Sequence, residues 1–227
     1  MGGGPGRSPE LGGLVEVRLH GRGGQGTVVA SLLLARAAML EGRGVQAFPE
    51  FGVERRGAPV TAFLRLSDAP IRLRCKVYEP DHVVVLDPSL LAQVDLPRGG
   101  HGWLVVNSPS APADLAVPEG WRVAAVDATR LARAHGVGGG ALPVVNSPMA
   151  GAFARASGLV GLASLEAAIR EMAPSAEEAN VRAAREAWDA VRLAAPPAGA
   201  PAREPAGDPA ARARPAAPPL PAAEATP

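Results

Sequence analysis

The sequence predicts an α/β fold, a three-layer α/β/α sandwich around a mainly parallel, Rossmann-like sheet. Strand-like and helix-like segments alternate along the chain, which is the first sign of this class. Residues 82–86 (HVVVL) form a short β-branched run that is typical of a parallel strand covered on both faces. The length of 227 residues suits one such domain with a tail.

The first unit is a strand, a glycine cluster and a helix. Residues 14–20 (LVEVRLH) alternate apolar and polar side chains, as a half-buried strand does. Residues 27–41 carry one long apolar face and stop near two glycines, which predicts a helix. Further strands are predicted at 45–48, 60–66, 71–77, 82–86, 103–106 and 122–126. A turn at 67–70 joins the strands at 60–66 and 71–77.

The helices that follow are predicted mainly from their capping signals. Asp87 and Pro88 supply an N-cap and a first-turn proline for a short helix through residue 92. Ser175 and Glu178 form a capping box for a helix over 176–193. The remaining two helices are predicted at 147–156, capped by Ser147 and Pro148, and at 164–172.

The chain divides into three parts. Residues 1–13 are rich in glycine and we expect them to be flexible, while residues 14–194 form the α/β domain. Residues 195–227 consist mostly of alanine and proline, and proline blocks helix and sheet hydrogen bonding. This segment is predicted to be a disordered tail.

The composition excludes several classes of partner. With 23 basic and 22 acidic residues the net charge is +1, and aromatic residues make up only 4%, so no nucleic-acid partner is expected. No stretch of about 18 uninterrupted apolar residues exists, so no membrane span is expected. Residues 1–13 lack the apolar core of a secretory signal, which predicts a cytoplasmic protein.

Metal and cluster ligands are scarce. The single cysteine, Cys75, cannot provide the roughly four thiolates that an iron–sulfur cluster needs. The four histidines (His20, His82, His101 and His135) lack the spacing of a metal site. We therefore expect no metal or cofactor held by this chain alone, so redox chemistry requires a bound cofactor or a partner.

The glycine cluster is the first candidate site. Gly21, Gly23 and Gly26 satisfy G-x-G-x-x-G between a predicted strand and a predicted helix, and Gly24 and Gln25 complete the loop. Backbone N–H groups of such a loop are able to approach an anion at a helix N-terminus. The acidic residue that closes the second strand of a dinucleotide site is displaced beyond a proline. A ligand-binding loop and a tight turn that packs helix on sheet both remain open.

The second candidate is the segment 49–60 (PEFGVERRGAPV). Arg55 and Arg56 follow the first strand–helix–strand unit, near the carboxyl ends of the strands, where open α/β sheets bind ligands. Arginine pairs well with carboxylate or phosphate groups. A solvated charged loop is the alternative. Elsewhere, His20 is placed to reach a ligand of the glycine loop, whereas Cys75 is expected within a strand.

Four motifs together carry a family resemblance: GRGGQG at 21–26, PEFGVERRGAPVTAFLRL at 49–66, PDHVVVLDPSLL at 80–91 and NSPMAGAFARASGLVGLASLEAAI at 146–169. In this order they resemble the gamma subunit of 2-oxoacid:ferredoxin oxidoreductases, chiefly the pyruvate and 2-oxoisovalerate branches. The resemblance spans about residues 15–188 and leaves out the tail.

The resemblance implies a subunit of a larger enzyme. Family members split a 2-oxoacid with thiamine diphosphate and magnesium, pass electrons through iron–sulfur clusters to ferredoxin, and transfer the acyl group to coenzyme A. The gamma subunit holds neither thiamine nor cluster, so alpha, beta and ferredoxin-like delta subunits are the implied partners. The chain is then expected to be inactive alone.

Within such a complex, the loop of Gly21, Gly23, Gly24, Gln25 and Gly26 and the loop of Arg55 and Arg56 are expected at the interface with the thiamine-binding subunit. There they would shape the approach of coenzyme A, whose phosphates suit arginines and exposed N–H groups. A stand-alone nucleotide-binding regulatory module and a pure scaffold are the alternatives.

Overall fold

The protein folds around one seven-stranded mixed sheet. The computed structural model describes residues 13–50, 57–97, 100, 102–139, 143–173 and 175–194. The segments expected to be flexible or disordered, 1–13 and 195–227, lie outside these residues except for Gly13. The strand order is β2-β3-β1-β4-β5-β6-β7. The strands are β1 (Val15–Arg22), β2 (Gly44–Pro49), β3 (Pro59–Ser67), β4 (His82–Val85), β5 (Trp103–Asn107), β6 (Arg122–Val126) and β7 (Arg192–Ala194).

The centre of the sheet is parallel and its margins are antiparallel. Strands β1, β4, β5 and β6 run in parallel, with Leu19 level with Val84. Strand β3 pairs antiparallel with both β1 and β2, and β7 pairs antiparallel with β6. The predicted α/β class with a mainly parallel central sheet is confirmed.

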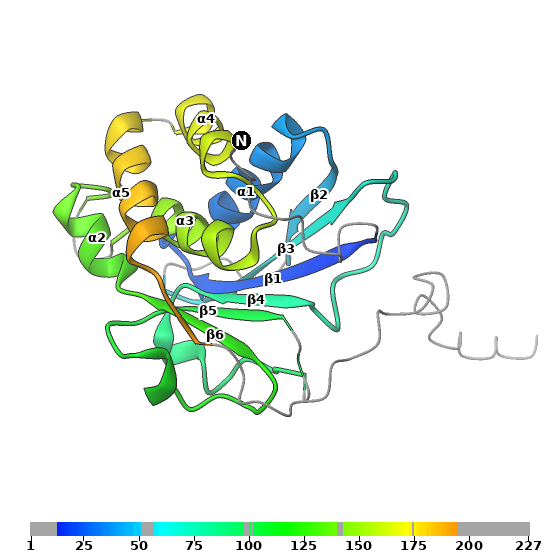
Figure 1. Ribbon diagram of the computed structural model, residues 1–227, viewed down its shortest axis with the longest axis horizontal. Coiled ribbons are helices and arrows are strands. Elements are labelled where there is room, and N and C mark those ends of the chain that lie inside the picture. Colours follow the sequence, from blue (N-terminus) through cyan, green and yellow to red (C-terminus); the bar gives the residue numbers. More distant parts are fainter. Residues whose placement is uncertain are drawn as a thin grey trace, which may run out of the picture.

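The five α-helices of the described residues cover the same face of the sheet, as Figure 1 shows. The helices are α1 (Thr27–Leu40), α2 (Ala128–Ala134), α3 (Asn146–Ser157), α4 (Leu162–Met172) and α5 (Glu177–Ala190). A large apolar cluster lies between them and the sheet, with Leu19, Phe153 and Leu165 completely buried in it. Among the described residues, no helix has the length and apolar character to cross a bilayer.

Irregular chain and short 3-10 turns cover the opposite face. The turns are η2 (Pro88–Leu90) and η3 (Pro112–Asp114). A smaller apolar cluster lies here, in which Val83, Leu104 and Val106 of the sheet contact Leu90 and Trp121. The second outer layer of the sandwich is therefore made of turns and loops in the described part of the chain.

One predicted strand, 71–77, is wrong. This segment has no strand pairing, and Cys75 within it is exposed. Both neighbours of β3 are already taken by β1 and β2, so the chain instead crosses the sheet face on its way to β4. Side chains of the sheet anchor it there, including Gln46, whose Nε2 donates to the Leu73 carbonyl at 2.9 Å.

The helix predicted over 176–193 ends earlier, and its predicted capping box is wrong. Helix α5 ends at Ala190, and the residues that follow form β7, because the edge of β6 offers them backbone partners. The N-cap residue is Ala176, in a left-handed conformation and without a side-chain cap. Glu178 instead accepts a hydrogen bond from Arg170 at 2.8 Å.

Two further local predictions are corrected near α2 and α3. Ser147 does not cap α3 but lies within it, and its hydroxyl donates to Asn180 Oδ1 at 2.8 Å. Helix α2 was not predicted, although its signal is present: Asp127 caps it by accepting from the Arg130 N–H at 2.9 Å. By contrast, the predicted cap at Asp87 is confirmed, since Asp87 accepts from the Ser89 N–H at 3.0 Å.

Candidate functional site

The glycine loop joins β1 to α1 and is shaped by close contacts. Gly26 precedes α1 with φ 83°, a left-handed conformation that favours glycine. A Cβ on Gly21 would lie 2.2 Å from Thr27 Oγ1, and a Cβ on Gly26 would lie 2.9 Å from Asn146 Cβ. Side chains at these two positions would push the loop away from α1 and from the start of α3. The tight-turn interpretation accounts for both glycines.

Gln25 ties the glycine loop to the end of β4. Its side chain is almost fully buried, with Oε1 accepting from the Arg22 N–H at 2.8 Å and Nε2 donating to Asp87 Oδ2 at 2.9 Å. Its own carbonyl accepts from the Val145 N–H at 3.1 Å, which fixes the chain leading into α3. The loop is thus held by the sheet on one side and by the helical layer on the other.

Arg22 and Asp87 complete this network at the carboxyl ends of β1 and β4. Arg22 Nε lies 3.3 Å from Asp87 Oδ2, and Arg22 Nη2 donates to Ser89 Oγ at 2.8 Å. Burial opposes ionisation of Asp87, but hydrogen bonds from Ser89 and Gln25 and the charge of Arg22 outweigh it and lower its pKa. Strands β1 and β4 flank the point where the connections change direction, which is where open α/β sheets commonly bind ligands.

The arrangement differs from a dinucleotide site in two respects. Strand β3 lies between β1 and β2, so the end of β2 is not adjacent to the glycine loop, as it is in the dinucleotide fold. Glu50, the acidic residue after β2, accepts a hydrogen bond from Lys76 at 2.9 Å. That bond is the largest cause of the lowered pKa of Glu50. Among the described residues of this region, no feature favours the stand-alone nucleotide-binding module.

The second candidate loop meets the first. Arg55 and Arg56 lie outside the described residues, but Gly57 and Ala58, which follow them directly, are described. The Gly57 N–H donates to the Gly23 carbonyl at 3.1 Å, and the Gly23 N–H donates to the Ala58 carbonyl at 2.9 Å. The carboxyl side of the arginine loop is therefore bonded to the glycine loop.

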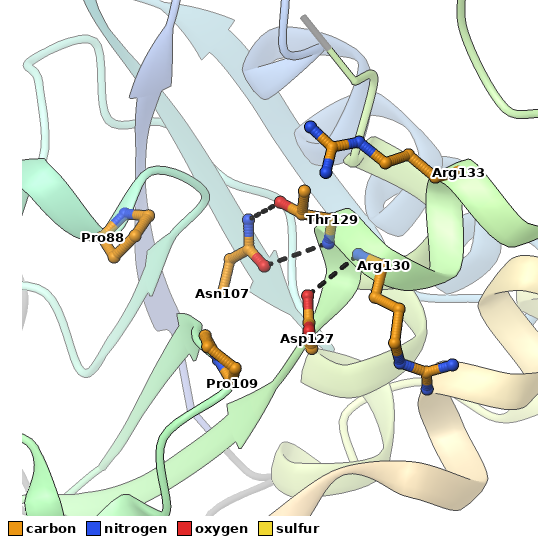
Figure 2. Close-up of a pocket in the computed structure, with 7 residues that line it drawn as sticks. All are labelled: Pro88, Asn107, Pro109, Asp127, Thr129, Arg130 and Arg133. Carbon is orange, nitrogen blue, oxygen red and sulfur yellow. Dashed lines mark hydrogen bonds between the residues drawn. The ribbon is translucent and has the colours of Figure 1, made fainter.

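A cavity of about 470 Å³ lies beside this network, at the carboxyl ends of β4, β5 and β6. Figure 2 shows Asn107 at its centre, donating to Thr129 Oγ1 at 2.9 Å and accepting from the Thr129 N–H at 3.2 Å. The guanidinium of Arg133 extends back over Thr129, whereas that of Arg130 points away. The lining residues are Pro88, Asn107, Pro109, Asp127, Thr129, Arg130 and Arg133.

Part of this cavity has a signal in the sequence. Two predicted strands end in a polar residue, Asn107 and Asp127, and the carboxyl ends of parallel strands meet at one edge of a sheet. The arginines belong to α2, which was not predicted, so their position beside these residues comes only from the fold.

His20 precedes the glycine loop in the sequence and lies on the face of the sheet opposite the helices. It does not belong to the described network around Asp87. Strand β1 alternates its side chains, so Leu19 packs under the helices and His20 faces the other way. Burial, together with the positive charge of Arg18, lowers the pKa of His20 to about 4. His20 is therefore uncharged near neutral pH.

No group of three or more metal-ligating side chains gathers among the residues that the structure describes. The whole sequence contains one cysteine, so the thiolates of an iron–sulfur cluster do not fit this chain.

Comparison with known proteins identifies the family. A family model described as pyruvate ferredoxin/flavodoxin oxidoreductase matches residues 16–190. The chain belongs to this family. The pyruvate/ketoisovalerate oxidoreductases common subunit gamma of Pyrococcus furiosus is 49% identical over 182 residues, covering 78% of this chain and 96% of that protein. Pyruvate synthase subunit PorC of Methanocaldococcus jannaschii is 44% identical over 180 residues, covering 78% of this chain and 96% of that protein.

A solved structure of a similar protein has the same fold. Pyruvate oxidoreductase subunit PORC from Thermotoga maritima superposes with a TM-score of 0.67 at 36% identity, covering 81% of this chain and 99% of that chain. The resemblance carried by the four sequence motifs is thereby confirmed.

Proposed function

We propose that this chain is the gamma subunit of a cytoplasmic 2-oxoacid:ferredoxin oxidoreductase. The complex would decarboxylate pyruvate or a related 2-oxoacid oxidatively, transfer the acyl group to coenzyme A and pass electrons to ferredoxin. The observation that carries this proposal is 49% identity to a common gamma subunit over 96% of that subunit's length. Alpha, beta and delta subunits are the proposed partners.

The cofactors are proposed to belong to the partners. Thiamine diphosphate, when bound, stabilises the carbanion formed on loss of carbon dioxide, and clusters accept the electrons. A single cysteine does not suffice for a cluster, and the G-D-G…N-N thiamine signature is absent from the sequence. This chain would contribute shape and charge at a subunit interface.

We further propose that the two candidate loops guide coenzyme A at that interface. The residues involved would be Gly21, Gly23, Gly24, Gln25 and Gly26 of the glycine loop and Arg55 and Arg56 of the arginine loop. The N–H groups of Gly23 and Gln25 donate to the carbonyls of Ala58 and Arg22 and so hold the loop in shape, and the guanidinium groups would contact the phosphates. The bonds between Gly57, Ala58 and Gly23 support this, because they join the arginine loop to the glycine loop. Charge-assisted bonds from arginine suit the phosphates of coenzyme A.

A tagged copy of the chain, purified from its native cell, tests the assignment. Co-purification of iron, thiamine diphosphate and further subunits, with 2-oxoacid-dependent reduction of ferredoxin, is the expected result. Turnover of a 2-oxoacid by the purified chain alone would contradict it.

Steady-state kinetics of the assembled complex test the role of the arginine loop. With Arg55 and Arg56 both changed to Ala, we expect the KM for coenzyme A to rise about tenfold or more, with thiamine content unchanged, because charge-assisted bonds are lost. The matched control is Arg170→Ala, which removes an exposed arginine paired with Glu178 on the helical side. Dissociation of the subunits would instead support a scaffold, and an unchanged KM in an intact complex would rule out contact with coenzyme A.

A further inference from the structure

A second cavity, of about 240 Å³, lies on the face of the sheet opposite the helices. Its floor is formed by neighbouring strands β1 and β3, and its wall by the chain after η2. His20 of β1 is level with Thr61 of β3 in the antiparallel register. The lining residues are Arg18, His20, Pro59, Val60, Thr61, Leu90, Gln93, Val94 and Asp95.

Two nitrogen atoms of this cavity are buried without a hydrogen-bond partner among the described residues. They are Arg18 Nε and His20 Nε2. Successive even positions of β1 face the same side, so both side chains project into the same space. A buried polar atom that makes no hydrogen bond costs free energy, so both atoms favour an acceptor between them.

The orientation of Arg18 is fixed by its other nitrogen atoms. Nη1 donates to the Tyr78 carbonyl at 3.4 Å, and Nη2 donates to the carbonyl of Asp95. Both acceptors are backbone groups without charge, and the carboxylates of Asp95 and Glu50 favour the charged guanidinium. Asp95 itself is exposed to solvent. Nε is thus held in place as a charged donor.

The rest of the cavity has both polar and apolar parts. Thr61 is level with His20 and its side chain hydrogen-bonds to Glu50, whereas Val60, Leu90 and Val94 provide hydrocarbon surface. A volume of about 240 Å³ is below the range of pockets for drug-sized ligands, which begins near 300 Å³. A small molecule with one anionic end and a short apolar part matches this lining.

We propose that this cavity binds a short-chain carboxylic acid, whose carboxylate accepts hydrogen bonds from Arg18 Nε and His20 Nε2. Its hydrocarbon part packs against the apolar wall. This site is separate from the loops that we propose for coenzyme A, because its residues lie outside the Gln25–Asp87 network.

Binding should be linked to protonation of His20. The charged groups around the imidazole are Arg18 on its own strand, Glu50 after β2, Lys76 on the crossing segment and Asp95 after η2. Without ligand the pKa of His20 is about 4, mainly because of burial and then because of Arg18. A bound carboxylate favours the imidazolium and raises this pKa. The affinity should therefore rise as the pH falls through the raised pKa toward 4.

Nuclear magnetic resonance of the full chain with labelled histidine side chains tests the proposal. Pyruvate is the probe, pyruvamide is its uncharged analogue, and His20→Gln assigns the His20 signal. We expect pyruvate to shift the His20 signal saturably and to raise its pKa by at least one unit, with no effect of pyruvamide. The signal of His135, which is paired with Glu186 on the helical side, should stay unchanged.

Variants sharpen the test. Arg18→Gln should weaken pyruvate binding at least tenfold, and Thr61→Val serves as a second, nearly isosteric variant with a smaller expected loss. Arg170→Gln is the matched control on α4 and should bind as the unmodified chain does. Failure of saturating pyruvate to move the His20 pKa, or an equal response to pyruvamide, would overturn the proposal. Neither outcome bears on the family or on the coenzyme A loops.

Discussion

The two faces of the sheet differ in what their side chains do. On the helical face, strand β1 contributes Val15, Val17 and Leu19 to one continuous apolar cluster. On the other face the same strand contributes Glu16, Arg18 and His20, and the apolar cluster there is confined to the β4–β6 side. One face is used mainly for packing, and the other keeps polar groups under partial cover.

This difference explains how a short strand serves two purposes. Successive residues of β1 face opposite sides of the sheet. The same eight residues therefore place apolar side chains in the core on one face and polar side chains on the other. Helices supply the dense cover that an apolar face needs, whereas loops leave cavities on the polar side. The following predictions test this division, from the largest expected effect to the smallest.

Matched leucine truncations compare the two apolar clusters directly. Leu34→Ala removes a fully buried side chain of α1, and Leu90→Ala removes one from the smaller cluster under β4 and β5. We expect a loss in the free energy of unfolding of about 4 kcal/mol for the first and about 2 kcal/mol for the second, within the range for buried leucines. Urea unfolding of the full chain measures both, and an equal loss would remove the distinction between the faces.

A buried ion pair holds the polar face between β1 and β3. Arg65 is completely buried, and its Nε donates to Glu16 Oε1 at 2.7 Å. Glu16→Gln should cost about 3 kcal/mol of unfolding free energy, because it leaves a buried guanidinium without its counter-charge. Glu171→Gln, which removes the exposed partner of Arg36, is the control and should cost less than about 1 kcal/mol.

The stability of the polar face should depend on pH through His20. Its pKa is about 4 in the folded chain against 6.5 as the ordinary value, so the unfolded chain binds more protons between these pH values. The contribution of His20 to the free energy of unfolding is then fully present above pH 6.5, and it decreases by about 2–3 kcal/mol as the pH falls to 4. His20→Gln should lack this decrease in urea titrations at several pH values, and a parallel decrease in both proteins would assign it to other groups.

The cap of α2 is the smallest of the expected effects. Asp127 accepts from the Arg130 N–H at 2.9 Å, so Asp127→Ala should cost about 1 kcal/mol of unfolding free energy. Asp127→Asn retains an acceptor and should recover most of it. If both variants lose the same amount, the carboxylate contributes by its charge rather than as a cap.

Much of the fold was predictable because its signals are local. The alternation of β1, the β-branched run of β4 and the cap at Asp87 each depend on a few neighbouring residues, and all three are confirmed. The prediction for residues 71–77 was wrong because alternation shows that a segment can form a strand, whereas the predicted hairpin also requires a free edge on β3, and β1 and β2 occupy both edges. The early end of α5 also depends on neighbouring strands, because the residues after the helix pair with the open edge of β6 and form β7.

The candidate sites also combine features that the sequence predicted with features that depend on the fold. The sequence predicted the glycine loop and the arginine loop, and the structure adds that Gly57 and Ala58 bond to Gly23. Neither the cavity around Asn107 nor the cavity that Arg18, His20 and Thr61 line was predicted. Both depend on which strands become neighbours.

The sequence by itself determined the α/β class, the position of the glycine turn and the family, because periodicity, capping and motif order are properties of the chain. Only the tertiary structure decided that β3 separates β1 from β2, that the helices share one face, and that His20 lies buried beside Arg18. These features arise from contacts between residues that are distant in sequence, and no local pattern records which of the possible contacts form.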